Sequence, residues 1–350
     1  MPATPYLCVD LPRLRRNIRV AAERADEAGI ALRPHAKTHK SIEIANLQLA
    51  AGATGISVAT IGEAETFIRN GVRDVLIAYP LWLGDDAGSR LLDLAPDARL
   101  AIGIDSPTSA ANAGRLLGGS SVEVMVEVDC GQHRSGSLPD QAGEIALAAQ
   151  RSGLTVRGVY TFPGHSYAVD AQESSARDEA TCLRTAVESM RAAGIEPQVV
   201  SGGSTPSLRF TDASVVNELR PGVYVFGDAQ QWELGVMDPS EIALTCRATV
   251  VSHAGDRLVL DAGSKVLGAD RAPYATGHGR LPHYPEARIV LLAEHHAVVD
   301  LAGAALPALG SQVDVVPNHV CNAVNLVDTL YAEESGELRP WQVAARGLNS

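Results

Sequence analysis

The feature that most constrains the fold of this 350-residue chain is an alternation of short apolar runs with longer amphipathic stretches, from Leu11 to Phe226. Candidate strands are the apolar segments 30–32, 55–59, 75–78, 100–104, 122–128, 156–160, 199–200 and 223–226. Helix-like segments between them include 11–28, 42–51, 61–70, 141–151 and 170–193. Glycines at predicted helix ends are Gly52, Gly71, Gly153 and Gly194. This pattern predicts a parallel sheet, and about eight strands suffice for a (β/α)8 TIM-type barrel.

The pattern of the chain changes after about residue 235. Segments 242–251, 257–261, 287–292, 297–301 and 311–316 are short, rich in β-formers and separated by Gly, Pro and Asp. They predict a smaller, mainly antiparallel β-domain. We therefore expect an α/β chain with two domains, a barrel over residues 1–235 and a β-domain over residues 236–350.

Charge and composition exclude several classes of function. The formal net charge is −12, so we expect no nucleic-acid-binding and no anionic-membrane-binding surface. No apolar run reaches the ~18 residues of a membrane helix. The first residues lack the basic and apolar regions of a signal peptide. Five cysteines, scattered and odd in number, favour a reducing compartment, and we expect a cytoplasmic protein.

A dense group of basic residues stands at the predicted end of the first strand. Residues 33–40 contain five groups that are, or can become, cationic, and they follow the apolar step 30–32. In barrels of this type, active-site residues lie at the carboxyl ends of the strands. Crowding by cations lowers the pKa of a lysine such as Lys37, and the neutral amine is the form that adds to an aldehyde. The alternative is a solvated basic loop.

Polar or glycine-rich segments follow several later strands, at 129–136, 164–167, 201–206 and 220–224. The run Ser201-Gly-Gly-Ser-Thr-Pro206 offers backbone N–H groups and hydroxyls that suit a phosphate. A second glycine turn near Gly222 strengthens this prediction, because barrel phosphate sites are built from late loops. The alternative is that both segments are ordinary turns.

A histidine and a cysteine in the predicted β-domain form a candidate metal motif. In an extended segment, His319 and Cys321 would face the same side. Imidazole and thiolate are a donor pair that suits Zn²⁺. Another polar run, Glu294-His295-His296, is a further source of ligands or of a proton donor. A satisfied histidine and a buried cysteine are the alternative.

Together these motifs resemble those of the fold-type III pyridoxal-phosphate enzymes of the alanine racemase-like group. The closer resemblance is to the D-serine dehydratase / D-threonine aldolase family, and it covers nearly the whole chain. It is carried by segments 4–11, 33–40, 59–65, 128–134, 164–167, 201–204, 220–222, 260–265 and 317–321. The resemblance implies a pyridoxal 5′-phosphate cofactor and a catalytic divalent metal, Zn²⁺ or alternatively Mn²⁺ or Mg²⁺.

The resemblance also implies a role for each matching residue. Lys37 matches the lysine that binds the cofactor covalently, and Arg134 matches the arginine beside the cofactor ring and its phenolic oxygen. The positions around the ring and the substrate are matched by Tyr160, Tyr167 and the catalytic residue His165. The phosphate cradle is matched by Gly202, Gly203, Ser204, Gly222 and Val223. The metal ligands are matched by His319 and Cys321.

The activity that the resemblance implies is a lyase reaction on a D-β-hydroxy-amino acid, with two outcomes. Loss of the hydroxyl is β-elimination, which converts D-serine to pyruvate and ammonia. Deprotonation of the hydroxyl leads to Cα–Cβ cleavage, which converts D-threonine to glycine and acetaldehyde. Within the family a His-x-Cys pair leans towards dehydratases and a His-x-Asp pair towards aldolases. We therefore predict a D-serine dehydratase-type elimination and keep the aldolase as the alternative.

Two other readings are weaker. The metal pair argues against a plain racemase, and the β-domain argues against a barrel that binds the cofactor without catalysis. The segment Phe162-Pro163 departs from the polar residues expected before Gly164, which leaves the substrate contacts there open. Family members are head-to-tail dimers, so we expect a homodimer with the site at the subunit interface.

Overall fold

The computed structural model describes residues 2–350, and their contacts separate into two compact units. The barrel unit consists of Ala21–Lys37, Gln48–Gly222 and Leu348–Ser350. The β unit consists of the residues up to Val20, Thr38–Leu47 and Val223–Gly347. As a domain assignment, the division into residues 1–235 and 236–350 stays a prediction.

Eight parallel strands form the barrel, in the order β2-β9-β8-β7-β6-β5-β4-β3. They are β2 (Ala31–Leu32), β3 (Ile56–Val58), β4 (Asp74–Pro80), β5 (Arg99–Ile104), β6 (Glu123–Glu127), β7 (Thr155–Tyr160), β8 (Val199–Gly202) and β9 (Glu218–Leu219). The two ends of this order are joined where Thr54 N donates to Leu32 O (2.9 Å) and Ser57 N donates to Pro34 O (2.8 Å). The predicted (β/α)8 TIM-type barrel is confirmed.

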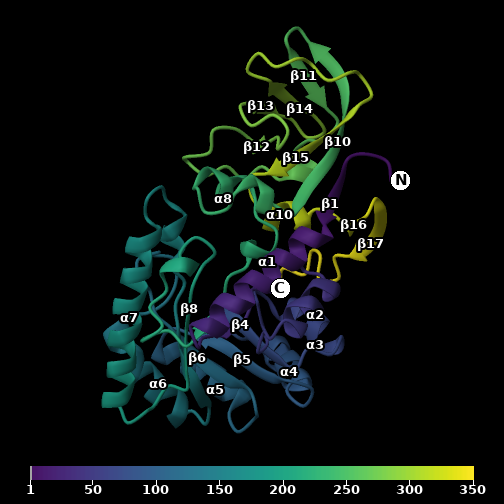
Figure 1. Cartoon of the computed structure of the whole chain (residues 1–350). Coiled ribbons are helices and arrows are strands. Elements are labelled where there is room, and N and C mark those ends of the chain that lie inside the picture. Colours follow the sequence, from purple (N-terminus) through teal and green to yellow (C-terminus); the bar gives the residue numbers. More distant parts are fainter. Residues whose placement is uncertain (1) are drawn as a thin grey trace. The chain divides into compact units, whose positions relative to one another are not determined.

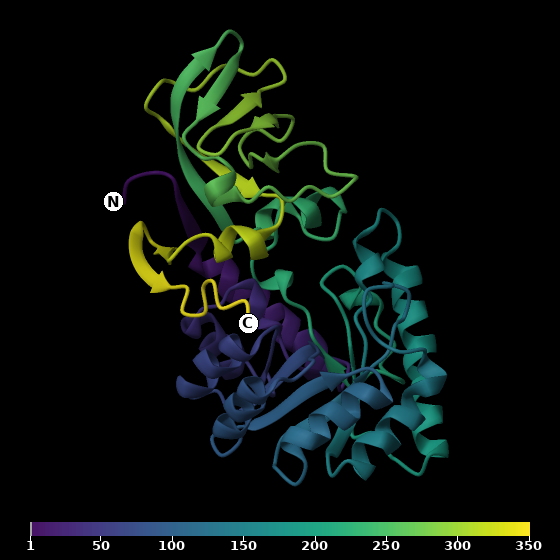
Figure 2. The ribbon, with the colours of Figure 1, turned by 180° about the vertical axis from the view of Figure 1, so that it is seen from behind.

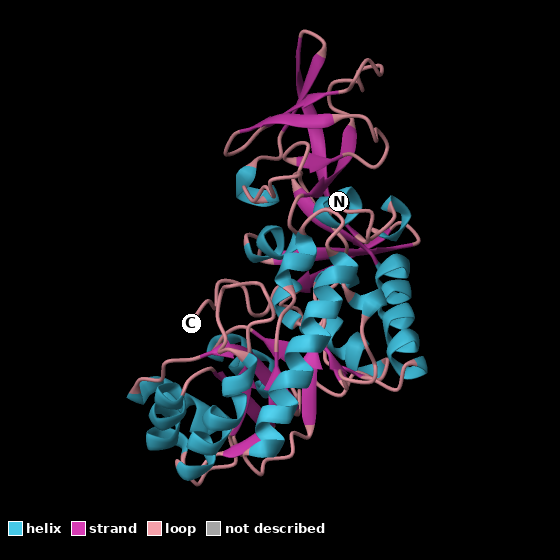
Figure 3. Ribbon diagram, turned by 90° about the vertical axis from the view of Figure 1, so that its left-hand side faces the viewer, coloured by secondary structure: helices cyan, strands magenta, loops and turns pink. Residues whose placement is uncertain are grey.

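The helices lie close to the predicted segments. They are α1 (Leu11–Glu27), α2 (Ile42–Ala50), α3 (Ile61–Arg69), α4 (Asp85–Leu94), α5 (Pro107–Leu117), α6 (Ala142–Arg151) and α7 (Gln172–Ala192). Consecutive helices from α3 to α7 pack side by side, and α4 to α7 cover the outside of the strands (Figure 1, Figure 3). Within residues 2–350, no helix has the length and apolar character that a membrane crossing requires. The predicted helix-ending glycines all have positive φ: Gly52, Gly71, Gly153 and Gly194.

One predicted barrel strand is wrong. Residues Val223–Val225 form the 3₁₀-helix η5, in which Phe226 N and Gly227 N both donate to Val223 O at 3.0 and 2.8 Å. The strand at this place in the barrel is β9 (Glu218–Leu219). A short apolar run does not distinguish a strand from a helical turn, and a strand of two residues that begins with a glutamate has no apolar periodicity to reveal it.

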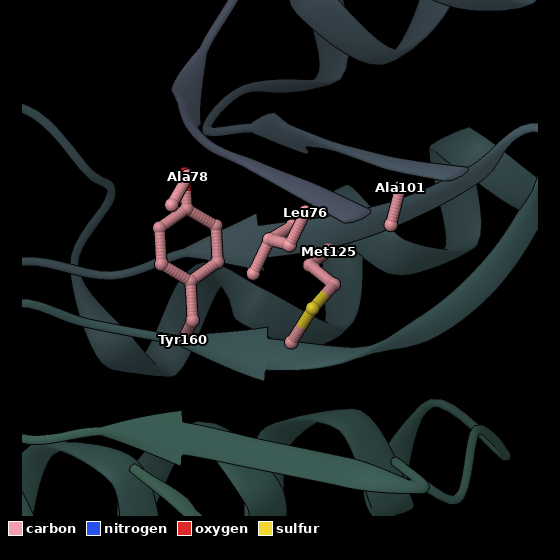
Figure 4. Packing of buried hydrophobic residues seen from close by; sticks show 5 residues of the cluster. All are labelled: Leu76, Ala78, Ala101, Met125 and Tyr160. Carbon is pink, nitrogen blue, oxygen red and sulfur yellow. The ribbon is translucent and has the colours of Figure 1, made fainter. Parts of the chain in front are cut away.

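The barrel interior is filled by side chains from neighbouring strands. One buried cluster, drawn in Figure 4, consists of Leu76, Ala78, Ala101, Met125 and Tyr160. A side chain at Gly103 would collide with the Tyr160 hydroxyl, so the glycine in β5 makes room for the aromatic ring. The barrel is therefore a packed core, as the TIM-type architecture requires.

A charged network in the barrel includes Asp74 and Glu218, the first residues of β4 and β9. Arg33 contacts Asp74 at 2.9 Å and Glu218 at 2.7 Å, and its side chain is 1% exposed. Arg157 contacts the same Asp74 carboxylate at 3.0 Å. The two guanidinium groups lower the pKa of Asp74 against the opposing effect of its burial. Because each charge is paired, the barrel tolerates these groups in its interior.

The β unit is built on a nine-stranded, mainly antiparallel sheet, as predicted. Its strands are β1 (Tyr6–Asp10), β10 (Leu244–Ala254), β11 (Arg257–Leu260), β12 (Gly279–Arg280), β13 (Arg288–Leu292), β14 (Ala297–Asp300), β15 (Gln312–Pro317), β16 (Thr329–Glu334) and β17 (Glu337–Gln342). β1, from the N-terminal end of the chain, pairs with β10 and, in parallel, with β16 (Figure 2). Short helices follow the strands: α8 (Ala229–Glu233), α9 (Ser264–Leu267) and α10 (Val320–Asn325).

Candidate active site

Three of the predicted site residues gather around Phe162 in the barrel unit. Lys37 lies in the 3₁₀-helix η1 (Ala36–Thr38), and its Nζ is 5.9 Å from the centroid of the Phe162 ring. The guanidinium carbon of Arg134 is 5.3 Å from the same centroid, and the ring centroid of Tyr167 is 6.4 Å away. The segments after β2, β6 and β7 supply these side chains. Phe162, where the resemblance had led us to expect a polar residue, is thus their common neighbour.

The expected crowding of Lys37 by cations is wrong in one respect. Arg33 belongs to the buried network, where Asp74 and Glu218 balance its charge. Lys40, in the β unit, donates a hydrogen bond of 2.7 Å to a side-chain amide. The prediction rested on sequence spacing alone. Two of the basic residues, Arg33 and Lys40, interact instead with partners that are distant in the chain.

His165 stands in the 3₁₀-helix η3 (Gly164–Tyr167) and is held from two sides. Its Nε2 is 3.3 Å from Asp178 Oδ2 on α7. A Cβ added at Gly131, where φ is +124°, would be 3.2 Å from the ring carbon Cε1 of His165. The buried Nδ1 of His165 has no hydrogen-bond partner in the structure. The ring is therefore positioned while one nitrogen stays available to a ligand.

Tyr160, predicted beside the cofactor ring, is fully buried in the barrel core. Its hydroxyl donates to Glu127 Oε2 at 3.3 Å, and the guanidinium carbon of Arg220 lies 4.9 Å from its ring centroid. Arg220 also donates through Nε to Ser201 Oγ at 2.8 Å. Burial raises the pKa of Tyr160 and of Glu127 and lowers that of Arg220. A contact between Tyr160 and the cofactor stays a prediction.

The predicted phosphate turn has no room for side chains at its glycines. Gly203 has a φ of +84°, and a Cβ there would be 2.6 Å from Leu219 Cδ2. A Cβ at Gly202 would collide with the carboxylate of Glu179. Close packing against Leu219 and Glu179 therefore requires glycine at both positions of this turn.

The carboxylate of Glu179, on α7, is hydrogen-bonded to this turn. Its Oε1 accepts a hydrogen bond of 2.6 Å from the N–H of Gly203, and its Oε2 is buried without a partner. Burial raises the pKa of Glu179 to about 7, although the Gly203 amide and Arg220 act in the opposite direction. The expectation that the turn presents this N–H to a phosphate therefore needs correction, because Glu179 already accepts from it.

Serine hydroxyls gather beside the same turn. Ser204 Oγ lies 2.8 Å from Ser166 Oγ and 2.8 Å from Ser207 Oγ, and all three residues are buried. The Ser204 N–H donates to Ser207 Oγ at 3.1 Å. Hydroxyl groups and side-chain-free glycines fit a phosphate, so the barrel residues suit the expected cofactor. The contributions of Gly222 in the barrel unit and Val223 in the β unit stay predictions.

The β unit brings the predicted metal ligands together. His319 immediately precedes α10, and Cys321 lies in its first turn. The Cys321 thiol donates to Thr38 Oγ1 at 3.3 Å. The reading of an extended segment is wrong, because the helix begins between the two residues. Imidazole and thiol still form a donor pair that fits Zn²⁺.

The carboxylate of Asp228, at the start of α8, is next to this pair. Its Oδ2 is 3.4 Å from His319 Nδ1, and its side chain is fully buried. Burial alone would lower the pKa of His319, but Cys321 and Asp228 together raise it. In the described part of the chain, no group of three or more His, Cys, Asp or Glu side chains could hold a metal. The exposed run Glu294–His296, whose first residue pairs with Lys265, therefore adds no ligand.

Several of these residues were missed by sequence reasoning. They are Glu127, Glu179 and Asp228, whereas Phe162 and Arg220 stand in segments that the sequence singled out without giving these two residues a role. A signal existed for two of them. Glu179 falls on the buried face of a long amphipathic helix, where a carboxylate is unusual. Asp228 immediately precedes a helical segment, where an aspartate is a preferred N-cap.

Family models match almost the whole chain. The model described as "Alanine racemase, N-terminal domain" matches residues 9–230. The model described as "Putative serine dehydratase domain" matches residues 243–332. The first match covers the strands of the barrel, and the second covers most strands of the β unit.

Characterised relatives resemble the chain over nearly its full length. A D-threo-3-hydroxyaspartate dehydratase of Delftia sp. (strain HT23) is 35% identical, over 91% of this chain and 90% of the relative. A D-threonine aldolase of Arthrobacter sp. is 33% identical, over 99% of this chain and 93% of the relative.

Solved structures of a D-threo-3-hydroxyaspartate dehydratase are also similar. A histidine-to-alanine variant has a TM-score of 0.91 at 31% identity, covering 98% of this chain and 95% of the other. A cysteine-to-alanine variant in a metal-free form has a TM-score of 0.90 at 31% identity, covering 98% and 97%.

Proposed function

This chain belongs to the D-serine dehydratase / D-threonine aldolase family of fold-type III pyridoxal-phosphate enzymes, and we propose that it eliminates water from a D-β-hydroxy-amino acid. It is a lyase, as its relatives named dehydratase and aldolase are. The products would be a 2-oxo acid and ammonia. D-serine is the simplest substrate of this class, and D-threo-3-hydroxyaspartate is the one that a relative's name gives.

One observation carries the choice of elimination over cleavage. The motif at 319–321 supplies an imidazole and a thiol, His319 and Cys321, where a His-x-Asp motif would supply a carboxylate in place of the thiol. The substituted histidine and cysteine of the solved dehydratase variants also stand two positions apart in that protein's numbering, and the cysteine variant is in a metal-free form. Zn²⁺ held by such a pair supplies Lewis-acid activation of a hydroxyl leaving group.

The barrel residues have separate tasks in this proposal. Bound pyridoxal phosphate supplies an electron sink for bonds at the substrate Cα. The Lys37 amine holds the cofactor and takes the proton from Cα. The Arg134 guanidinium places a positive charge beside the cofactor ring, and the Phe162 ring, which both side chains approach, excludes water there. The hydroxyl of Ser204, beside the turn at Gly203, receives the phosphate, while the Gly203 N–H stays bonded to Glu179.

His165 is the second group that we assign to proton handling. Asp178 fixes the Nε2 side of its ring, and the unpartnered Nδ1 is the atom that would face a substrate or water. An imidazole held in this way can accept or donate a proton at Nδ1 without rotating its ring.

Cleavage to glycine and an aldehyde is the second candidate. The D-threonine aldolase relative covers the chain as fully as the dehydratase does, at nearly the same identity. The same histidine and thiol could hold a metal that lowers the pKa of the substrate hydroxyl instead of promoting its departure.

Product identity decides between the two candidates. Purified protein, loaded with pyridoxal phosphate and zinc, is incubated separately with D-serine, D-threonine and D-threo-3-hydroxyaspartate, and L-serine serves as the control. We expect a 2-oxo acid and ammonia in equal amounts from a D-substrate, and nothing from L-serine. Glycine with an aldehyde as the main products would favour the aldolase. Absence of turnover on every D-substrate would contradict both.

A further inference from the structure

Asp228 is a buried carboxylate that the proposed chemistry does not use directly. Its Oδ1 accepts a hydrogen bond of 2.9 Å from Gln231 N, which makes it the N-cap of α8. Its Oδ2 accepts one of 3.2 Å from Val320 N, at the start of α10. The same Oδ2 lies 3.4 Å from His319 Nδ1. One carboxylate therefore joins the beginnings of two helices and faces one nitrogen of the candidate metal ligand.

The segment that carries the donor pair is held on another side as well. Asn318 donates through Nδ2 to the backbone oxygens of Asp270 (3.0 Å) and Gly277 (2.9 Å), and it is 4% exposed. Asn322 donates to the carboxylate of Asp270. The backbone around His319 is thus fixed before any ligand binds, and the rotation of its imidazole is the freedom that remains.

A histidine binds a metal through one ring nitrogen, which must carry a lone pair. The hydrogen bond at the other nitrogen decides which tautomer is present and how the ring is oriented. A carboxylate beside Nδ1 favours the tautomer with the proton on Nδ1, and the lone pair then lies on Nε2. Asp228 is itself a poor candidate for a ligand, because both of its oxygens accept backbone N–H groups and its side chain is fully buried.

We propose that Asp228 is a positioning residue that orients His319 through Nδ1 and leaves Nε2 to bind the metal. This inference rests on the proposed function, because it presupposes the metal site at His319 and Cys321. The alternative is that Asp228 acts only as a helix cap. The two readings differ in what they predict for zinc affinity and for the histidine tautomer.

The first test measures zinc affinity by competition with a chromophoric chelator, on the full-length protein loaded with pyridoxal phosphate. Asp228→Asn keeps the size of the side chain and an oxygen for the Gln231 amide, but it removes the charge and the acceptor at Oδ2, which faces both His319 and Val320 N. Loss of such a partner typically weakens metal binding about 10- to 100-fold, and we expect a change in this range. Asp238→Asn is the matched control, because Asp238 caps the 3₁₀-helix η6 (Pro239–Glu241) without a histidine beside it. We expect its zinc affinity to stay unchanged.

The second test is measured on the wild-type protein, and a variant serves only to assign the resonances. Wild-type protein with ¹⁵N-labelled histidine is loaded with ¹¹³Cd²⁺, and the His319 resonances are assigned with His319→Gln. We expect the cadmium coupling at Nε2 and a proton on Nδ1. Coupling at Nδ1, or an unchanged zinc affinity in folded Asp228→Asn, would overturn the positioning role. If Cys321→Ala leaves zinc affinity unchanged, the metal site itself fails, which is a separate result.

Discussion

At the scale of single residues, partners that are distant in the sequence determine the chemistry. Phe162 interrupts an expected polar segment, yet Lys37, Arg134 and Tyr167 all lie around its ring. Arg33 stands four positions before Lys37, but its charge is balanced inside the barrel. The reactivity of a lysine or a carboxylate in this protein therefore follows from its tertiary surroundings.

The position of the cofactor-binding lysine can be tested directly. Borohydride reduction of the loaded protein should attach the cofactor irreversibly to Lys37, which peptide mass spectrometry would locate. Lys37→Ala should lose this attachment. Lys265→Ala is the control, because that lysine is exposed and pairs with Glu294 at 2.7 Å. Attachment at Lys40 in either protein would contradict the assignment.

The buried carboxylate of Glu179 should make stability depend on pH. Burial raises its pKa from 4.5 to about 7 in the folded protein. Between these values the folded state binds more protons than the unfolded state, so its contribution to stability falls as the pH rises through this window and stays low above it. Glu179→Gln keeps an acceptor for Gly203 N–H and removes the ionisation.

Urea unfolding of the wild type and Glu179→Gln at pH 5 and pH 8 measures this effect. From pH 5 to pH 8, we expect the free energy of unfolding of the variant to increase relative to that of the wild type, by about 3 kcal/mol at most. Cofactor should be saturating or absent in both proteins, so that binding does not contribute. A difference between the two proteins that is the same at both pH values would mean that Glu179 does not ionise in this window.

At the scale of the elements, short turns and 3₁₀-helices carry most of the candidate site. Lys37 lies in η1, His165 and Tyr167 lie in η3, and Gly203 follows β8. Strands and helices of the barrel are long enough to be read from periodicity, whereas these connecting pieces are not. Their conformation depends on glycines and on the neighbouring side chains.

The glycine turn after β8 offers a matched pair of substitutions. Gly203→Val should cost about 1–2 kcal/mol in backbone energy, and its side chain would also meet Leu219 Cδ2, which is 2.6 Å from the Cβ position. We expect a strong loss of cofactor affinity. Gly194→Val has a similar φ of +80° but no atoms within 4 Å of its Cβ, so it reports the backbone cost alone.

Cofactor titration followed by absorbance distinguishes these outcomes. The predicted result is weak binding in Gly203→Val and ordinary binding in Gly194→Val, with thermal unfolding used to confirm that both are folded. Equal cofactor affinity in the two variants would place the phosphate elsewhere in the barrel.

At the scale of the whole molecule, the proposed activity needs donors from both units. Lys37 belongs to the barrel unit, and His319 and Cys321 belong to the β unit. Removing zinc with EDTA should leave the cofactor absorbance of the protein intact, since the barrel residues hold it. Elimination of water from D-serine should stop and should return when zinc is added. Full turnover by protein shown to be metal-free would contradict the proposed role of zinc.

We also propose that the protein is a homodimer with the site at the subunit interface. Large apolar side chains are exposed on loops after barrel strands, namely Trp82, Leu138 and Val169, at 71%, 62% and 57% exposure. A dimer interface would bury such side chains where they form one contiguous patch. Sedimentation velocity should show a dimer, and Trp82→Glu should weaken it. A fully active monomer would contradict the proposal.

The amino-acid sequence by itself determined the fold class, most helix positions and the residues of the site motifs. Periodicity, helix-ending glycines and the basic and His-x-Cys motifs are local, so they can be read without coordinates. The candidate metal donors were identified in this way, since a single residue, Val320, separates His319 from Cys321.

Tertiary structure alone decided the surroundings of these residues. The strand expected at 223–226 became a 3₁₀-helix, and β9 took its place in the barrel. Glu179, 24 positions before Gly203, holds the glycine turn, and Asp228, 91 positions before His319, faces its imidazole. The physical reason is that burial and partner distance set protonation and orientation, and both arise from contacts between residues whose separation in the chain carries no periodic signal.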